Sequence, residues 1–222
     1  MHLNSKLLFE RYALSSLEEG QRILEIGATG YPSEYAKMAN IGLENWYSLD
    51  IEKKHIGDAG RNKKHILSSE LYNYPIDDCY FDIVLAGQVI EHVADIWIWL
   101  IELKRITKKG GKIIIICPVS WPYHEAPIDC WRIYPEGFKV LAKKTGLILQ
   151  KVLYESLEAA QVPKQTPTYP NISSFKDNGV LNRSAKVKNR INGILQHVPL
   201  INRYRLSISV AYDSLAIFVK NE

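Results

Sequence analysis

The sequence predicts an α/β fold with a doubly wound, mainly parallel sheet. Apolar runs typical of buried strands alternate with helical patterns along the chain, which indicates strands joined by crossover helices. No unit is repeated within the sequence. With 222 residues, 46% of them hydrophobic and 23% charged, the chain can bury a sizeable core. We therefore expect a single domain over residues 1–222.

Seven strands and four helices can be placed from these patterns. The strands are expected at residues 22–26, 46–50, 64–67, 81–87, 111–117, 148–155 and 214–219. The helices are expected at residues 5–16, 33–40, 94–107 and 135–145. Ser33 can cap the second helix, and Pro135 suits the first turn of the fourth.

The first predicted strand ends in an acid and a glycine-rich turn, Glu25-Ile26-Gly27-Ala28-Thr29-Gly30. Glycines at 27 and 30 remove the Cβ atoms that would keep a ligand away from the backbone, although both can also be ordinary turn residues. The turn lacks the Gly-x-Gly-x-x-Gly spacing of a nicotinamide site. About 20 residues later the second strand ends at Asp50, where a carboxylate can accept two hydrogen bonds from ribose hydroxyls.

Two later segments add to this pattern. Residues 81–93 contain Phe-Asp-Ile-Val and then Glu-His-Val, and residues 103–118 end a helix, pass through Gly110-Gly111 and enter an apolar strand. In order and spacing, the four segments resemble the class I S-adenosylmethionine-dependent methyltransferases over roughly residues 20–160. The resemblance implies a Rossmann-like sheet of seven strands with the last one antiparallel, S-adenosylmethionine as cofactor, and methyl transfer. The first turn departs from the family, because Thr29 stands where its second glycine is usual.

The resemblance also implies a set of cofactor-binding residues. Glu70 falls where relatives carry the acid that receives the adenine amino group, although a solvated surface glutamate is the alternative, and a backbone N–H at Leu71 would meet the ring. Gln88 matches the position that faces the methionine end. The full predicted set is Glu25, Gly27, Thr29, Gly30, Asp50, Ile51, Glu70, Leu71 and Gln88.

Two histidines are candidates for a catalytic base. Methyl transfer from a sulfonium is an in-line displacement, so positioning the acceptor can itself remove much of the barrier. A base is needed only where the acceptor must lose a proton, and imidazole titrates near neutral pH. His124 is the preferred base and His92 the second candidate, although His92 can instead pack at a helix start or make a structural hydrogen bond.

Residues 119–137 follow the fifth strand and should therefore lie over the same edge of the sheet as the cofactor. Tyr123, Asp129 and Arg132 are the predicted substrate-binding residues in this segment. Its pattern, Tyr-His-x-x-Pro-x-Asp-x-Trp-Arg-x-x-Pro-Glu-Gly, resembles a methyltransferase subgroup associated with sugar or surface-polysaccharide pathways. Trp131 and Arg132 can equally form a structural brace beneath the loop.

Cysteine and histidine spacing predicts no metal site. Cys79, Cys117 and Cys130 form no Cys-x-x-Cys pair, so we expect reduced structural thiols. The six histidines are scattered without ligand spacing.

Residues 156–211 interrupt the pattern before the last strand and are predicted to form an insertion or lid. Prolines at 163, 167 and 170 exclude a regular helix there, whereas residues 186–198 are predicted to form a basic amphipathic helix. This helix can pack on the core, bind phosphate or carboxylate groups of an acceptor, or dock on an anionic membrane. A net charge of +4 is too small to favour a nucleic acid partner.

These features together predict an S-adenosylmethionine-dependent methyltransferase that O-methylates a saccharide or related small molecule. Alternatives are a quinone, amine or natural-product acceptor, or a non-catalytic module that keeps the fold and the pocket. The sequence has no apolar run of about 18 residues and no secretory segment at Met1–Lys6, so we expect a cytoplasmic protein. The oligomeric state is not indicated.

Overall fold

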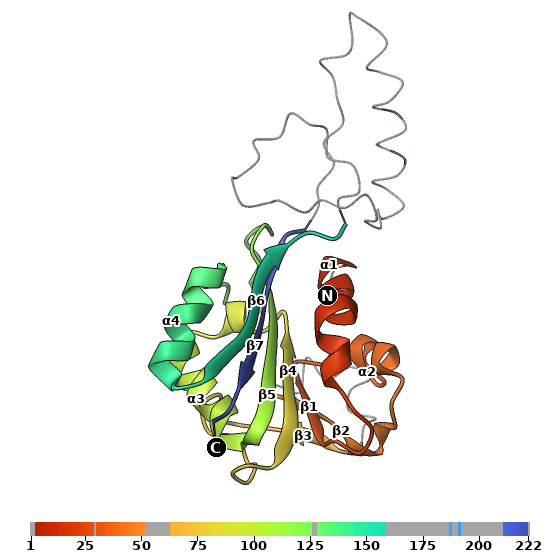
Figure 1. The fold of residues 1–222 in the computed structure, drawn as a ribbon, viewed down its shortest axis with the longest axis vertical. Helices are drawn as coiled ribbons and strands as arrows, with labels where there is room; N and C mark the ends of the chain where they lie inside the picture. The colour runs from red at the N-terminus through yellow and green to blue at the C-terminus, as the bar shows by residue number, and fades with distance from the viewer. Residues whose placement is uncertain are drawn as a thin grey trace, which may run out of the picture.

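The computed structural model describes residues 3–28, 30–51, 63–125, 128–158, 187, 191 and 211–221. A seven-stranded sheet runs through the described part, with α3 and α4 on one face and α1 and α2 on the other (Figure 1). This is a three-layer α/β arrangement, as the alternation of strands and helices predicts.

The sheet has the strand order β3-β2-β1-β4-β5-β7-β6. Strands β1 to β5 pair in parallel with one another, and β7 pairs antiparallel with both β5 and β6. The predicted fold class, with an antiparallel last strand, is confirmed. The bounds of the strands are β1 Ile23–Ile26, β2 Trp46–Asp50, β3 His65–Leu67, β4 Phe81–Gly87, β5 Thr107–Pro118, β6 Ile148–Glu155 and β7 Asp213–Val219.

The helices begin and end close to their predicted positions. The first helical segment is α1, Leu3–Leu8, continued by a π turn at Phe9–Ala13 and a 3-10 turn at Leu14–Ser16. Helix α2, Glu34–Ala39, is capped as predicted, because Ser33 accepts a hydrogen bond from the backbone of Ala36. The other two helices are α3, Ile96–Ile106, and α4, Pro135–Thr145; short 3-10 turns lie at Leu43–Asn45 and Ile90–His92.

Strand β5 is longer than predicted. Residues 107–110 were expected to form the end of a helix and a glycine turn, but Thr107 pairs with Phe81 at the start of β4. Gly110 N donates to Lys220 O at 2.9 Å, which ties this segment to the chain after β7. These long-range pairings extend the strand back to the end of α3.

The isoleucines of β5 supply both halves of the core. Ile113 and Ile115 pack against residues of α3 and α4, whereas Ile114 and Ile116 pack against residues of α1 and α2. A strand that is covered on both faces reads as a continuous apolar run rather than an alternating one. The run at 113–116 is therefore explained by its central place in the sheet.

Asn4 joins the first helix to the edge of the sheet. Its side chain donates to Glu155 O at 3.0 Å and to Asp213 Oδ2 at 2.7 Å, and its side-chain oxygen accepts from Leu157 N at 2.7 Å. Its backbone N–H donates to Glu158 at 2.7 Å. Asn4 thus holds the end of β6 and the start of β7 together.

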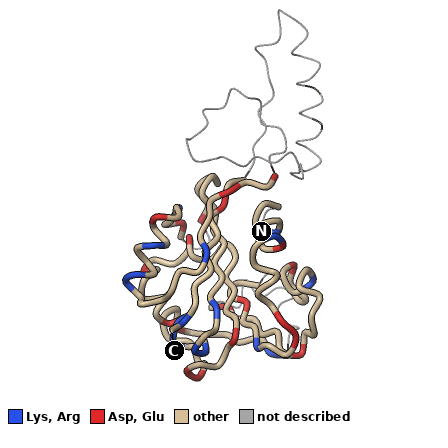
Figure 2. Tube along the Cα trace, in the orientation of Figure 1, with Lys and Arg blue, Asp and Glu red and all other residues tan. Residues whose placement is uncertain are grey.

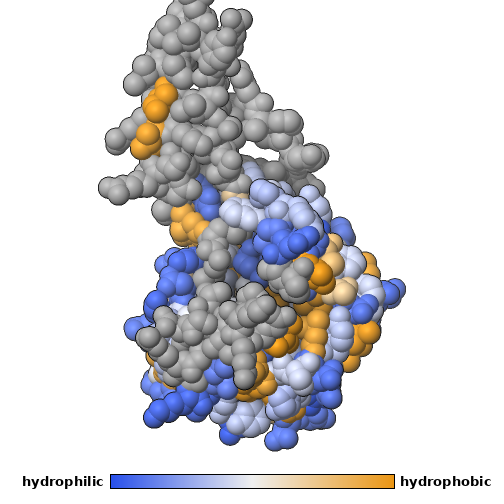
Figure 3. Space-filling view, turned by 180° about the vertical axis from the view of Figure 1, so that it is seen from behind, coloured by the Kyte–Doolittle hydropathy of each residue, from blue (hydrophilic) through white to orange (hydrophobic). Residues whose placement is uncertain are grey.

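The described surface is mixed in charge and carries exposed apolar side chains, several of them on α3. Basic and acidic residues alternate along the trace in Figure 2, and neither sign dominates one region of it. Apolar surface is seen on the side that carries α3 (Figure 3), where Trp97, Ile98 and Ile101 are exposed. The Trp97 ring lies 6.1 Å from that of Trp131, so this surface continues toward the loop after β5.

Nearly all of the predicted insertion lies outside the described residues. Within 159–210 only Val187 and Ile191 are described, and both are exposed. The lid and the basic helix at 186–198 therefore stay predictions. Among the described residues, no helix is long and apolar enough to cross a membrane.

Candidate active site

The carboxyl ends of β1 to β5 meet at one edge of the sheet, which we call the carboxyl rim. The strand order reverses between β1 and β4, because β1 pairs with β2 on one side and with β4 on the other. Ligands of open α/β sheets bind at such a reversal, outside the carboxyl ends of the strands. Most of the predicted site residues follow these strands directly.

The glycine turn after β1 is held next to β2. Gly27 N donates to Leu49 O at 2.9 Å, so the turn lies beside Asp50. Gly27 has a φ of +70°, and a Cβ on it would lie 2.9 Å from a side-chain carbon of Val89. Only glycine therefore fits this position without strain. Gly30 has open space around it, and Thr29 lies outside the described residues.

Glu25 is buried beneath this turn. It accepts hydrogen bonds from the Ser33 hydroxyl and from Trp46 Nε1, which join β1 to α2 and β2. Burial raises the pKa of Glu25 to about 7, although the two donors act in the opposite direction. These contacts give Glu25 a role in positioning the turn, and its contact with a cofactor stays a prediction.

The raised pKa of Glu25 predicts a pH-dependent stability. The folded protein binds this proton more tightly than the unfolded chain, so the contribution is full below the ordinary pKa of 4.5 and is lost as the pH rises through about 7. Between about pH 5 and about pH 7, the free energy of unfolding of the natural protein should decrease by about 2 kcal/mol more than that of Glu25→Gln, which cannot ionise. Urea unfolding at several pH values measures this difference. Parallel curves for the variant and the natural protein would contradict it, and Glu136→Gln, an exposed change on α4, is the control.

The ends of β2 and β3 bring four more predicted residues together. Asp50 Oδ1 accepts from Ile51 N at 2.7 Å, and Asp50 O accepts from Ser68 N at 2.9 Å. The Ser68 hydroxyl bonds the backbone of Glu70, whose side chain is exposed, and Leu71 is half-buried. Asp50 and Glu70 thus lie on neighbouring strand ends, and their cofactor contacts stay predictions.

Gln88 is anchored from the other side of the rim. It has a φ of +61°, and its backbone N–H donates to Ile116 O at 2.8 Å. Its side chain donates at 3.4 Å to Asp213, the buried first residue of β7, which also binds Asn4. The sequence interpretation missed Asp213 and Asn4 because 209 residues separate them along the chain. The only signal was a polar residue at the start of the last apolar strand.

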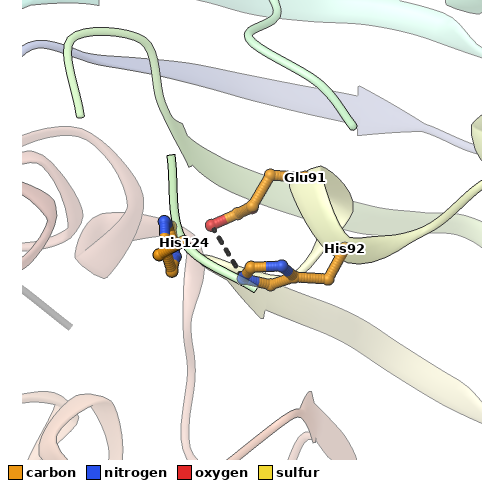
Figure 4. Close-up of side chains that lie close together, drawn as sticks. All are labelled: Glu91, His92 and His124. Atoms are coloured by element: carbon orange, nitrogen blue, oxygen red, sulfur yellow. Dashed lines mark ion pairs between the residues drawn. The ribbon is translucent and has the colours of Figure 1, made fainter. Parts of the chain in front are cut away.

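The structure brings the two predicted catalytic histidines together. His92 ends the 3-10 turn after β4, His124 lies in the loop after β5, and their ring centroids are 5.0 Å apart (Figure 4). A carboxylate oxygen of Glu91 lies 3.8 Å from His92 Nε2. Burial raises the pKa of Glu91 to about 8 and lowers that of His92. The sequence interpretation did not select Glu91, although it stands next to His92.

The loop that carries His124 is braced internally. Arg132 donates to both carboxylate oxygens of Asp129, and Asp129 also accepts from His124 N at 2.8 Å. Arg132 holds the pKa of Asp129 below its ordinary range, and the Asp129 side chain is only 1% exposed. This geometry favours the brace over direct substrate contact for these two residues. Tyr123 is 71% exposed and donates to Glu125, and the substrate roles of all three stay predictions.

The three cysteines are unpaired, as predicted from their spacing. Cys117 is buried in β5, whereas Cys79 and Cys130 are exposed rather than part of the core.

Comparison with known families finds a match for the part of the chain that runs from β1 into β5. Residues 24–115 match the family model of the methyltransferase domain. This segment is therefore similar to methyltransferase domains. It contains the glycine turn, Asp50, Glu70, Gln88 and the Glu91-His92 pair, and it ends in β5.

Individual proteins are also similar to the chain. An uncharacterized methyltransferase of Schizosaccharomyces pombe is 30% identical over 115 residues, which cover 46% of this chain and 41% of that protein. The chain thus spans less than half of this curated relative.

Two solved structures share the fold. The complex of the Haloferax volcanii Trm112 methyltransferase activator with a methyltransferase has a TM-score of 0.58 at 15% identity, covering 98% of this chain and 94% of that one. Phosphoethanolamine N-methyltransferase 2 of Haemonchus contortus, solved with S-adenosyl-L-methionine, has a TM-score of 0.57 at 16% identity, covering 98% and 52%.

Proposed function

We propose that the protein transfers the methyl group of S-adenosylmethionine to an oxygen of a saccharide or related small molecule. The family match over residues 24–115 supports methyl transfer. The observation that carries the cofactor assignment is the hydrogen bond from Gly27 N to Leu49 O, which sets the glycine turn beside Asp50. The turn can then take the methionine part of the cofactor while the Asp50 carboxylate takes the ribose hydroxyls.

The acceptor is proposed to bind between the cofactor and the loop after β5. His92 and His124 stand at this end of the rim, on the loops that follow β4 and β5. An acceptor hydroxyl must lose its proton as the methyl group is transferred, and a nearby imidazole can accept it. His124 is the preferred base because its side chain is 39% exposed and can reach an acceptor.

The saccharide preference rests on the resemblance of residues 121–137 to sugar-pathway methyltransferases. An amine acceptor is the second candidate, and it is favoured by the fold shared with a phosphoethanolamine N-methyltransferase. A cytoplasmic location, a glycan or other small-molecule acceptor and a peripheral membrane contact through residues 186–198 belong to the same proposal. A non-catalytic module would bind the cofactor without consuming it.

Calorimetry with S-adenosylhomocysteine tests the cofactor assignment. We expect one molecule to bind per chain, and no detectable heat at millimolar ligand would contradict the assignment. Release of S-adenosylhomocysteine from S-adenosylmethionine then tests acceptors, with nucleotide sugars and lipid-linked glycans set against amines and quinones. Turnover with sugars alone supports the preferred acceptor, and turnover with amines alone overturns it.

A further inference from the structure

Glu91, His92 and His124 form a compact group at the carboxyl rim (Figure 4). One ligand atom of each residue lies within 4.8 Å of the others. Residues 91 and 92 belong to the turn after β4, whereas His124 comes from the loop after β5. No local spacing in the sequence therefore predicts that the three residues meet. We propose that these three side chains bind a divalent transition-metal ion, with Zn²⁺ as the first choice.

Glu91 provides the first argument. Its side chain is fully buried, and neither carboxylate oxygen has a hydrogen-bond partner among the described residues. The nearest basic atom is His92 Nε2, at 3.8 Å, which is beyond hydrogen-bonding distance. Buried carboxylates are normally paired or coordinate a metal, because desolvation strongly disfavours an isolated buried charge. A cation placed between Glu91 and the two imidazoles would supply the missing partner.

The orientation of the imidazoles provides the second argument. His92 Nδ1 lies 2.5 Å from Ile128 O, and His124 Nδ1 lies 3.1 Å from Pro122 O. A carbonyl oxygen can only accept, so each Nδ1 carries a proton, and in the neutral ring Nε2 then has the lone pair that a metal needs. Ligand histidines of metal sites are fixed in this way by carbonyl or carboxylate acceptors behind them. Asp129 adds such a carboxylate, with Oδ2 at 3.4 Å from His124 Nδ1.

The distances are compatible with one ion after a small closure. Ligands about 2.1 Å from a tetrahedral zinc ion are separated from one another by about 3.4 Å. The Glu91 to His92 pair is at 3.8 Å, and the whole group is within 4.8 Å. Because His124 lies in a loop and is 39% exposed, its side chain can supply most of this movement.

The donor set selects the class of metal. Two imidazoles and one carboxylate suit zinc and its transition-metal neighbours better than Mg²⁺ or Ca²⁺, which prefer oxygen ligands alone. Three protein ligands leave at least one position open for an oxygen of water or of an acceptor hydroxyl. An imidazole that binds the ion has no lone pair left to accept a proton, so with the ion bound the metal, rather than a free His124, would lower the pKa of an acceptor hydroxyl at the open position. That use of the open position rests on the proposed function, whereas binding of the ion does not.

Metal titration tests the proposal without cofactor or acceptor. Chelator-treated full-length protein is titrated with Zn²⁺ and with Co²⁺ by calorimetry, and the Co²⁺ complex is also followed by its visible absorption. We expect one ion per chain, and at least tenfold weaker binding in Glu91→Gln and in His124→Ala. Glu91→Gln keeps the shape of the side chain, and His124→Ala changes an exposed loop, so both variants should fold. His65→Gln, on β3, is the control that should bind like the natural protein.

Two results would overturn the proposal: no binding of either ion up to millimolar concentration, or unchanged affinity in both Glu91→Gln and His124→Ala. Thermal unfolding gives an independent readout, since Zn²⁺ should raise the Tm of the natural protein and of His65→Gln but not that of Glu91→Gln. Calorimetry with S-adenosylhomocysteine on the metal-free protein separates a failure of this site from a failure of the proposed activity.

Discussion

Asp50→Ala should bind S-adenosylhomocysteine about 30-fold to about 150-fold more weakly than the natural protein. A carboxylate that accepts from two ribose hydroxyls makes charge-assisted hydrogen bonds, and losing them costs about 2–3 kcal/mol, where about 1.4 kcal/mol is a factor of ten. The glycine turn is tied to Leu49 rather than to the Asp50 side chain, so the variant should keep the shape of the rim. Calorimetry at one pH and salt concentration measures the change.

Two further variants sharpen this measurement. Asp77→Ala removes an exposed acid before β4 and should leave the affinity unchanged. Asp50→Asn keeps one side-chain oxygen for Ile51 N but loses the charge, so its affinity should fall between those of Asp50→Ala and the natural protein. If Asp50→Ala binds as tightly as Asp77→Ala, the ribose contact lies elsewhere.

His124→Ala should lower kcat by about 100-fold or more with a hydroxyl acceptor. The imidazole is the exposed member of the Glu91, His92 and His124 group, and its loop stays braced by Asp129 and Arg132 when the ring is removed. Initial rates of S-adenosylhomocysteine release at saturating cofactor measure the change, using the acceptor found by screening.

Lys139→Ala is the matched control for this rate, because Lys139 forms a surface ion pair with exposed Glu136 on α4. An unaltered kcat in His124→Ala would show that this histidine is not the catalytic base. The same variant also separates two ways of acting: a free base affects the rate alone, whereas a metal ligand affects both the rate and the affinity for Zn²⁺.

Elements with strong local patterns could be predicted to the residue. Strand β4 and helix α4 have the predicted bounds, because the first is a buried apolar run and the second begins with proline and ends before a glycine. The start of strand β5 could not be predicted, because Gly110-Gly111 is a turn signal in the sequence. The strand extends through this signal because distant residues, in β4 and at Lys220, pair with it. Tertiary pairing decides such boundaries.

The residues of the candidate site also fall into those that a local sequence pattern predicts and those that depend on tertiary contacts. Gly27, Asp50 and Gln88 could be predicted because each directly follows an apolar strand, and parallel strands end at one edge. The burial of Glu91 without a hydrogen-bond partner for its carboxylate could not be predicted, because it arises only when the loop after β5 covers the turn after β4. Cys130 N donates to Glu91 O at 2.7 Å, a contact between these two loops that no local pattern encodes.

The hydrogen bonds of Asn4 have a consequence for how the chain can vary. The Asn4 side chain hydrogen-bonds both the end of β6 and the start of β7. The two ends of the segment between these strands are therefore fixed independently of what lies between them. Evolution can then lengthen, shorten or replace that polypeptide without shifting β7 against β5. The hydrogen bonds of one asparagine side chain thus keep the end of β6 and the start of β7 in place, whatever the length of the segment that joins them.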